Sequence, residues 1–233
     1  MNAEFRQGIR HGIPIALGYL SVSFAFGMKA AGAGLTVLQA VLISMTNLTS
    51  AGQIAALPLM VGGASLTEMA LTQLTINLRY ALMSLSLSRK LDGSMGTLQR
   101  LIFSFANTDE IFAVASSQPG KVGKHYLYGL MLTPWIGWSL GTLLGSAAGT
   151  LLPAFVRTAL GIAIYGMFLA IIMPPARQQK PVRFVVIIAV ALSLCFRYVP
   201  GLNTVSGGFV IIICGVAAAA AGAWKFPVKE DAA

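Results

Sequence analysis

Residues 38–58 decide the fold, and they read LQAVLISMTNLTSAGQIAALP. Apolar side chains fill both ends of this stretch, whereas hydroxyl and amide side chains concentrate at its centre. An unpaired polar group in lipid costs several kcal/mol, so these groups either pair with neighbouring helices or line a wet cavity. Gly52 and Pro58 favour a break in the helix, and a broken helix exposes backbone groups that hold zwitterions or ions. The candidate substrate-binding residues of this stretch are Asn47, Thr49, Ser50 and Gln53.

The rest of the chain shares this apolar character. Of its 233 residues, 56% are hydrophobic and 10% are charged, whereas a soluble domain is about 25% charged. The composition excludes a disordered chain, a coiled coil, a collagen and a disulfide scaffold, and it predicts an all-α, polytopic integral membrane protein of the cell membrane. A spanning helix needs about 20 residues. We expect about seven transmembrane helices, at roughly 13–31, 37–62, 66–88, 126–151, 158–175, 183–200 and 204–223.

The third apolar segment carries a charge close to its middle, at Arg79, two residues after Asn77. A charge at that depth costs at least about 2.5–3.5 kcal/mol, so Arg79 must face the interior and find a partner. The partner is either the carboxylate of a substrate or an acidic side chain, among which Glu68, Asp109 and Glu110 are the candidates. A structural ion pair and a helix-end arginine that reaches the interface remain open as alternatives.

The longest linker runs from residue 89 to residue 125. Within it, residues 101–116 are apolar but carry the adjacent acids Asp109 and Glu110, and this part is too short and too polar to span. We predict an interfacial or re-entrant helix. Acids at low dielectric can carry protons, so this pair is a candidate proton relay or gate. The alternative is a solvated helix N-terminus that Asn107 or Thr108 caps.

A glycine repeat marks the fourth segment, where every fourth residue is glycine. Such a face lets another helix approach closely, in the same chain or in another, and it says nothing about chemistry. The helix-packing candidates are Gly137, Gly141, Gly145 and Gly149.

Basic residues in the loops predict an orientation through the excess of Lys and Arg in cytoplasmic loops. With seven spans, Arg6, Arg10 and Arg157 lie on one side, and eleven basic residues lie on the other. This places the N-terminus outside and the C-terminus in the cytoplasm; if 101–116 spans, the N-terminal half flips. The eleven are Lys29, Arg89, Lys90, Arg100, Lys121, Lys124, Arg177, Lys180, Arg183, Lys225 and Lys229.

An internal duplication is suggested by Leu78-Arg79-Tyr80, which recurs as Phe196-Arg197-Tyr198. We expect a single transmembrane domain over residues 1–233, in which 13–88 and 126–200 would form a 3+3 inverted repeat like those of many secondary transporters. Chance similarity is the alternative, because apolar sequences repeat easily.

Enzymatic chemistry finds little support. A GxSxG pattern at 137–141 lies in a glycine-faced helix rather than at a strand-to-helix turn. Cys195 and Cys214 have no CxxC partner, and the sequence contains no HExxH or P-loop pattern. We therefore expect no enzyme, no metal and no cofactor. The net charge of +9 is distributed between apolar runs, which indicates topology and lipid contact rather than nucleic-acid binding.

Four stretches in this order resemble the AzlC-type permeases, the larger subunit of branched-chain amino-acid exporters. They are Pro14 to Gly27, Ser44 to Leu57 around Gln53, Ile76-Asn77-Leu78-Arg79-Tyr80, and Thr108-Asp109-Glu110. The chain departs from the family pattern in the order Ser50-Ala51-Gly52, where the family has Gly-Ala-Ser, and in Tyr80, where the family more often has His.

The resemblance implies gradient-driven efflux of branched-chain amino acids together with a small AzlD-type membrane subunit of roughly four helices. In such an exporter, the broken helix with Asn77 and Arg79 would bind the amino acid, and Asp109 and Glu110 would relay protons or gate. The alternatives are a non-transporting scaffold or assembly subunit and, with less support, a membrane-embedded enzyme.

Overall fold

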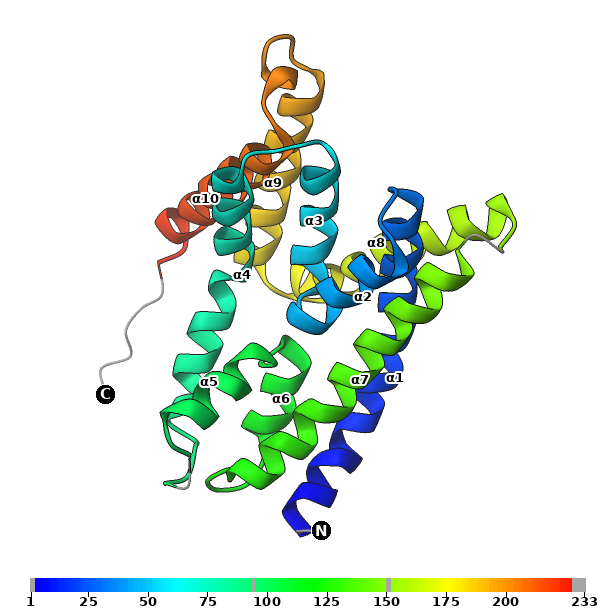
Figure 1. Ribbon diagram of the computed structural model, residues 1–233. Helices are drawn as coiled ribbons and strands as arrows, with labels where there is room; N and C mark the ends of the chain where they lie inside the picture. Colours follow the sequence, from blue (N-terminus) through cyan, green and yellow to red (C-terminus); the bar gives the residue numbers. More distant parts are fainter. Residues whose placement is uncertain (1–2, 94, 150–151, 228–233) are drawn as a thin grey trace. The chain divides into compact units, whose positions relative to one another are not determined.

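The computed structural model describes residues 3–93, 95–149 and 152–227, and the described chain is helical, with one isolated bridge between Leu91 and Val122 (Figure 1). Lys229, one of the residues in the orientation count, lies outside the described residues. The helices are α1 (Ala3–Gly32), α2 (Val37–Thr46), α3 (Ser50–Val61), α4 (Leu66–Ser88), α5 (Thr97–Phe105), α6 (Asp109–Ser117), α7 (Lys124–Ala148), α8 (Ala154–Gln178), α9 (Lys180–Tyr198), the 3-10 turn η1 (Leu202–Thr204) and α10 (Gly207–Lys225).

The all-helical expectation is confirmed for the described chain. Three of its helices are both long enough and apolar enough to cross a membrane, namely α1, α9 and α10. The count of seven spans and the inverted repeat stay predictions. The chain divides into two compact units, the first from Met1–Leu57 with Ile76–Ile164 and the second from Pro58–Thr75 with Tyr165–Ala233. Each unit is described separately.

Helices α1 and α7 form the core of the first unit, where they run side by side in the same direction (Figure 1). A Cβ on Gly137 would meet the backbone of Ala16, and a Cβ on Gly145 would overlap the backbone of Phe24. A Cβ on Gly27 of α1 would likewise overlap the backbone of Thr142 of α7. The glycine repeat of α7 therefore packs against a helix of the same chain, and close approach of the two backbones is what glycine permits.

Helix α2 begins with a capping box, in which Thr36 Oγ1 accepts from the Gln39 amide at 3.2 Å and Gln39 Oε1 accepts from the Thr36 amide at 2.9 Å. It ends at Thr46, and after three residues α3 turns back. Ala40 near the start of α2 and Leu57 near the end of α3 belong to one buried apolar cluster. In a straight helix, residues 17 positions apart would be about 25 Å apart. Helices α2 and α3 therefore form a hairpin.

This hairpin corrects two expectations for residues 37–62. The helix is broken, but the break lies at residues 47–49, where Asn47 is extended, whereas Gly52 and Pro58 both lie inside α3. Asn and Thr compete with helical backbone bonding through their own side chains, which explains why the break falls there. The chain also turns at this break instead of continuing in one direction, since Ala40 and Leu57 share one buried cluster with Phe26 and Ala30 of α1.

Helices α5 and α6 form a second hairpin. The Lys90 ammonium donates to the Ser116 carbonyl, and Leu91 pairs with Val122, so the segment ends beside the point where it began. Its tip is the three-residue turn at residues 106–108. Residues 97–117 thus form two short helices where a single helix over 101–116 was expected, and the interfacial or re-entrant location stays a prediction.

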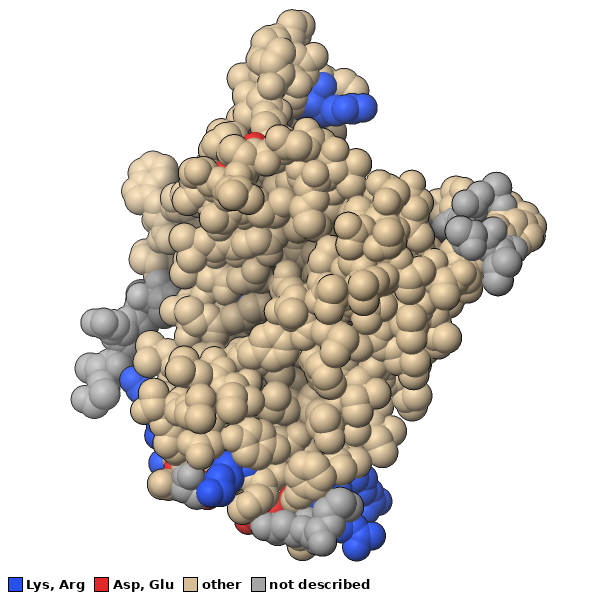
Figure 2. Space-filling view, viewed as in Figure 1, with Lys and Arg blue, Asp and Glu red and all other residues tan. Residues whose placement is uncertain are grey.

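The ends of these helices correct the expected orientation. His125 Nδ1 lies 3.8 Å from Glu4 Oε2, and Lys121 Nζ donates to the Arg89 carbonyl at 2.7 Å. The start of α1 therefore lies at the same end of the unit as the 89–124 linker, and Figure 2 shows Lys and Arg at this end. The expectation that Arg6 and Arg10 face the opposite side is wrong, because the α2–α3 hairpin returns where a span was assumed.

The second unit contains a helical hairpin of α9 and α10, connected by η1. Gly222 of α10 lies against Val185 of α9, and Phe184 packs edge-on to Phe226 with ring centroids 5.6 Å apart. The first part of α4 belongs to this unit, and its Glu68 side chain reaches the start of α10.

Candidate functional site

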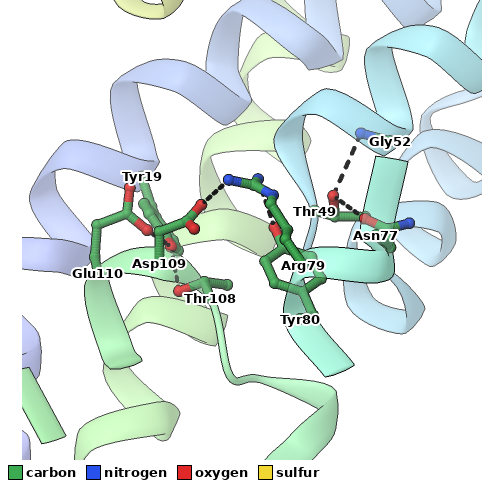
Figure 3. Close-up of polar contacts among 9 residues, drawn as sticks. All are labelled: Tyr19, Thr49, Gly52, Asn77, Arg79, Tyr80, Thr108, Asp109 and Glu110. Carbon is green, nitrogen blue, oxygen red and sulfur yellow. Dashed lines mark hydrogen bonds and ion pairs between the residues drawn. The ribbon is translucent and has the colours of Figure 1, made fainter. Parts of the chain in front are cut away.

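The predicted intramembrane charge has a partner in the first unit. Arg79 Nη1 of α4 lies 2.5 Å from Asp109 Oδ2, at the start of α6 (Figure 3). Arg79 Nη2 donates to the Tyr80 hydroxyl at 3.3 Å, and its guanidinium carbon lies 4.8 Å from the Tyr80 ring centroid. Of the three acidic partners that the sequence allowed, the structure selects Asp109. The protein leaves almost half of each charged side chain uncovered, so the pair is accessible to a small polar molecule.

Glu110, the second acid, faces a different helix. The Tyr19 hydroxyl of α1 lies within hydrogen-bond distance of Glu110 Oε2, at 2.5 Å, and of Thr108 Oγ1, at 2.6 Å (Figure 3). Thr108 is the N-cap residue of α6 but makes no side-chain capping bond. The hydroxyl that could have capped the helix is instead bound to Tyr19, so the two acids are held by two different helices.

The tip of the α2–α3 hairpin contacts α4. Thr49 Oγ1 donates to Asn77 Oδ1 at 2.9 Å, and it accepts from the Gly52 amide at 3.3 Å (Figure 3). Two predicted site residues from separate segments therefore meet. Ser50, at the start of α3, is partly exposed, as is Asn47.

The Gln53 side chain is enclosed by the protein and hydrogen-bonded within it. It is fully buried, and its amide nitrogen donates to Ser44 Oγ at 3.2 Å and to the Asn47 carbonyl at 2.9 Å. Its amide oxygen accepts from Trp138 Nε1 at 3.1 Å. Both N–H groups and the oxygen are thus used within the protein. Gln53 closes the gap between α2 and α3, and through Trp138 it ties the hairpin to α7.

The tip of the second hairpin also contacts α4. Asn107 is 2% exposed, and its amide nitrogen donates to Ser84 Oγ at 2.9 Å. Its amide oxygen is buried without a hydrogen-bond partner. Leu48 and Ala106, one from each tip, belong to one apolar cluster. Along α4, Asn77 therefore holds the first tip and Ser84 holds the second, and Arg79 binds the acid that follows the second tip.

The sequence had not selected Tyr19, Ser84 or Trp138 as site residues. Tyrosine and tryptophan carry a polar group on an apolar body and are common in apolar helices, so no pattern distinguished them. Asn107 and Thr108 were recognised only as possible caps. A signal did exist, because each hairpin tip carries the pattern Asn-x-Thr or Asn-Thr, at 47–49 and at 107–108.

No group of three His, Cys, Asp or Glu side chains comes together in the part of the chain that the structure describes. Cys195 and Cys214 are free thiols there, the first exposed and the second buried. The polar groups of the site are amides, hydroxyls, one charged pair and the second acid Glu110, which is chemistry suited to binding a small polar molecule.

Comparison with known proteins identifies the family. The family model described as AzlC protein matches residues 14–152. The chain belongs to the AzlC family. The matched range contains both hairpins, α4 and all of α7, and hence every contact of the site described above. No solved structure matches the chain.

The relatives of this AzlC-family chain are membrane proteins. It is 26% identical to "Inner membrane protein YgaZ" of Escherichia coli over 77% of this chain and 76% of that protein. It is 31% identical to an uncharacterized membrane protein of Archaeoglobus fulgidus, over 74% of this chain and 76% of the relative, and 30% identical to one of Helicobacter pylori, over 69% and 74%. These findings support a membrane protein with a transporter-type role.

Proposed function

We propose that the chain is a gradient-driven exporter of branched-chain amino acids that acts with a small AzlD-type membrane subunit. The observation that carries this proposal is the ion pair of Arg79 and Asp109, at 2.5 Å, beside the tips of two helical hairpins. An amino acid carries one carboxylate and one ammonium, so it matches the two halves of such a pair. When the pair opens, Arg79 takes the carboxylate and Asp109 takes the ammonium.

The energetics of the bilayer support exchange of partners at this pair. A charge without a partner at depth costs at least about 2.5–3.5 kcal/mol, so neither side chain stays unpaired. A zwitterion replaces one ion pair by two and leaves no charge uncompensated. Release of the amino acid restores the direct contact of Arg79 with Asp109, which gives a resting state without substrate.

The hairpin tips supply the neutral part of the site in this proposal. Hydroxyl and amide groups lie at or beside the first tip, on Asn47, Thr49, Ser50 and Asn77. Helix α3 also begins there, so its first backbone N–H groups are at the tip. A helix N-terminus favours a carboxylate. Gln53 acts as a positioning residue, because its own polar atoms are occupied.

Leucine counterflow tests the proposal. Proteoliposomes that contain the chain and its partner subunit are loaded with unlabelled leucine, and entry of labelled leucine is measured. We expect Arg79→Gln and Asp109→Asn to lower exchange at least tenfold, whereas Arg183→Gln, which changes an exposed arginine of α9, leaves exchange unchanged. Equal exchange in all three variants contradicts the site assignment.

Reconstituting the two subunits individually and together distinguishes the exporter from the alternative, a non-transporting scaffold or assembly subunit. If the partner alone exchanges leucine as fast as the pair does, this chain is an assembly subunit and the proposal is wrong. If the site variants of this chain abolish exchange by the pair, the transport path passes through this chain.

A further inference from the structure

Glu68 of the second unit is a buried acid that the proposed transport site does not use. Its side chain is in the first turn of α4 and is 5% exposed. Ser65 precedes it by three residues and accepts from its backbone amide at 3.1 Å, which is half of a capping box. In a complete box the Glu68 carboxylate would return to Ser65. Instead, Glu68 Oε1 accepts from the Ser206 hydroxyl and, at 3.0 Å, from the Gly208 amide at the start of α10.

A second polar group points to the same place. Thr72, one turn after Glu68, is fully buried, and its hydroxyl oxygen has no hydrogen-bond partner. A Cβ on Gly208 would lie 2.5 Å from Glu68 Oε1 and 2.7 Å from Thr72 Oγ1. Both oxygens therefore line the small space that the absence of a side chain on Gly208 leaves. Three oxygen-bearing side chains and one amide N–H surround this space.

A purely structural role explains only part of this arrangement. A carboxylate at a helix N-terminus is stabilising, so Glu68 could simply cap α10. That role leaves Thr72 unexplained, because a buried hydroxyl without a partner costs about 1–3 kcal/mol. It also leaves a buried carboxylate without a cation, since no Lys, Arg or His of the described chain lies within 4 Å of it.

The neighbouring helices carry few groups that titrate or bear charge. On α10, which Glu68 contacts, these are Lys225 at the far end and Cys214, two turns from Ser206. Helix α9, which leads into η1 and Ser206, carries Cys195, Arg197 and Tyr198 at its end and Lys180 and Arg183 at its far start. Glu68 is thus the acidic group of this cluster, with hydroxyl groups as its immediate surroundings.

We propose that Glu68, Thr72 and Ser206 form a proton-binding site, and that the proton carried on Glu68 drives the export proposed above. The Glu68 carboxylate takes up one proton and becomes neutral, with Thr72 Oγ1 as the acceptor that then pairs with the new O–H group. Loss of the proton restores the carboxylate that α10 stabilises. No bond of the exported molecule changes, and one proton enters and leaves per cycle. This inference rests on the proposed function.

The test uses everted membrane vesicles from cells that express the chain with its partner. Uptake of labelled leucine into vesicles with an acidic interior measures export driven by the proton gradient. Leucine counterflow without a pH gradient measures leucine exchange that needs no proton coupling. Glu68→Gln keeps an oxygen that accepts from Ser206 and Gly208 but cannot exchange a proton. We expect gradient-driven uptake to fall at least tenfold and counterflow to stay within twofold of the unchanged protein. Gradient-driven uptake at the normal rate in Glu68→Gln overturns the inference.

The counterflow assay separates this inference from the proposed function. Absence of counterflow in the unchanged protein refutes the transport proposal itself. Counterflow together with uptake driven by a sodium gradient, with the pH gradient collapsed, leaves transport intact and overturns the proton site.

A pair of glycine variants tests the space beside Gly208. Gly208→Ala places a methyl group against Glu68 and Thr72, and we expect it to lower gradient-driven uptake as Glu68→Gln does. Gly215→Ala, two turns along the same helix, adds a methyl group that would lie 4.0 Å from Thr75 Cγ2, an ordinary van der Waals contact, so uptake should be normal. Thr72→Val, which has nearly the same shape, should alter the pH dependence of uptake. Equal behaviour of both glycine variants and an unchanged pH profile in Thr72→Val contradict the inference.

Discussion

Gln53 is the residue whose role the structure changes most. The sequence pointed to it as a substrate-binding amide, but its side chain is fully buried and bound to Ser44, Asn47 and Trp138. A side chain without a free donor or acceptor positions its neighbours. It holds the broken ends of α2 and α3 together and anchors them to α7.

Replacing Gln53 by leucine should therefore destabilise the protein. The change leaves the Trp138 N–H and the Asn47 carbonyl without partners in a buried place, and it should cost about 2–5 kcal/mol. Thermal unfolding in detergent measures the loss. Gln178→Leu, at an exposed glutamine of α8, is the control and should unfold like the unchanged protein. Identical unfolding of both variants would show that the Gln53 contacts contribute nothing.

At the scale of helices, two hairpins differ from the sequence prediction. Helices α2 and α3 replace one predicted span, and α5 and α6 replace one predicted short helix. The sequence correctly predicted a broken helix, but it did so from Gly52 and Pro58, which both lie inside α3, whereas the break falls at residues 47–49. The direction of α3 after the break was not predictable, since a broken helix continues or reverses according to what it packs against. Leu57 packs with Phe26, Ala30 and Ala40, and apolar side chains of this kind carry no directional signal in the sequence.

Cross-linking tests the α2–α3 hairpin. In a chain without other cysteines, Ala40→Cys and Leu57→Cys should be joined by a short bifunctional thiol reagent, because both positions lie in one cluster. In a continuous helix they would be about 25 Å apart and would not react together. Mobility on a denaturing gel after proteolysis between the two positions detects the link. Ala40→Cys paired with Ala115→Cys, a buried alanine of the other apolar cluster of this unit, is the matched pair, and equal yields in both would contradict the hairpin.

The α1–α7 contact depends on the absence of side chains. Gly145→Leu would drive a side chain into the α1 backbone at Phe24, and we expect loss of most of the folded protein. Gly18→Leu lies on the same pair of helices but meets no atom within 4 Å, so it should be tolerated. Size-exclusion chromatography of a fluorescent fusion compares them. Equal monodisperse yield of both variants would contradict the close packing.

For the whole molecule, the sequence predicted the class of protein and the residues that meet at the candidate site, but it did not predict the direction in which each helix runs. Asn77 and Arg79 were selected from one segment, and Thr49 and Asp109 from two others, and all four meet as pairs. Polar side chains within apolar sequence need hydrogen-bond or charge partners, and this requirement is why these residues could be selected from the sequence. The orientation depended on counting spans, and a single hairpin read as a span reverses it.

The N-terminus should therefore face the cytoplasm. The start of α1 shares one end of the first unit with the basic 89–124 linker, and cytoplasmic ends carry the excess of Lys and Arg. In a chain without Cys195 and Cys214, a cysteine introduced at Ala3 should resist an impermeant thiol reagent in intact cells and react in everted vesicles. Labelling in intact cells would contradict this orientation. The residues at this end are Arg6, Arg10, Arg89, Lys90, Arg100, Lys121 and Lys124.

The central claim is that Arg79 and Asp109 exchange their mutual contact for the two charges of an amino acid. The most direct measurement is leucine counterflow by the charge-swapped double variant Arg79→Asp with Asp109→Arg, beside each single variant. The swap restores an ion pair but reverses its polarity relative to the hairpin tips. The account predicts that the double variant recovers thermal stability and still exchanges leucine at less than a tenth of the normal rate. Recovery of both stability and exchange would show that the pair is only structural.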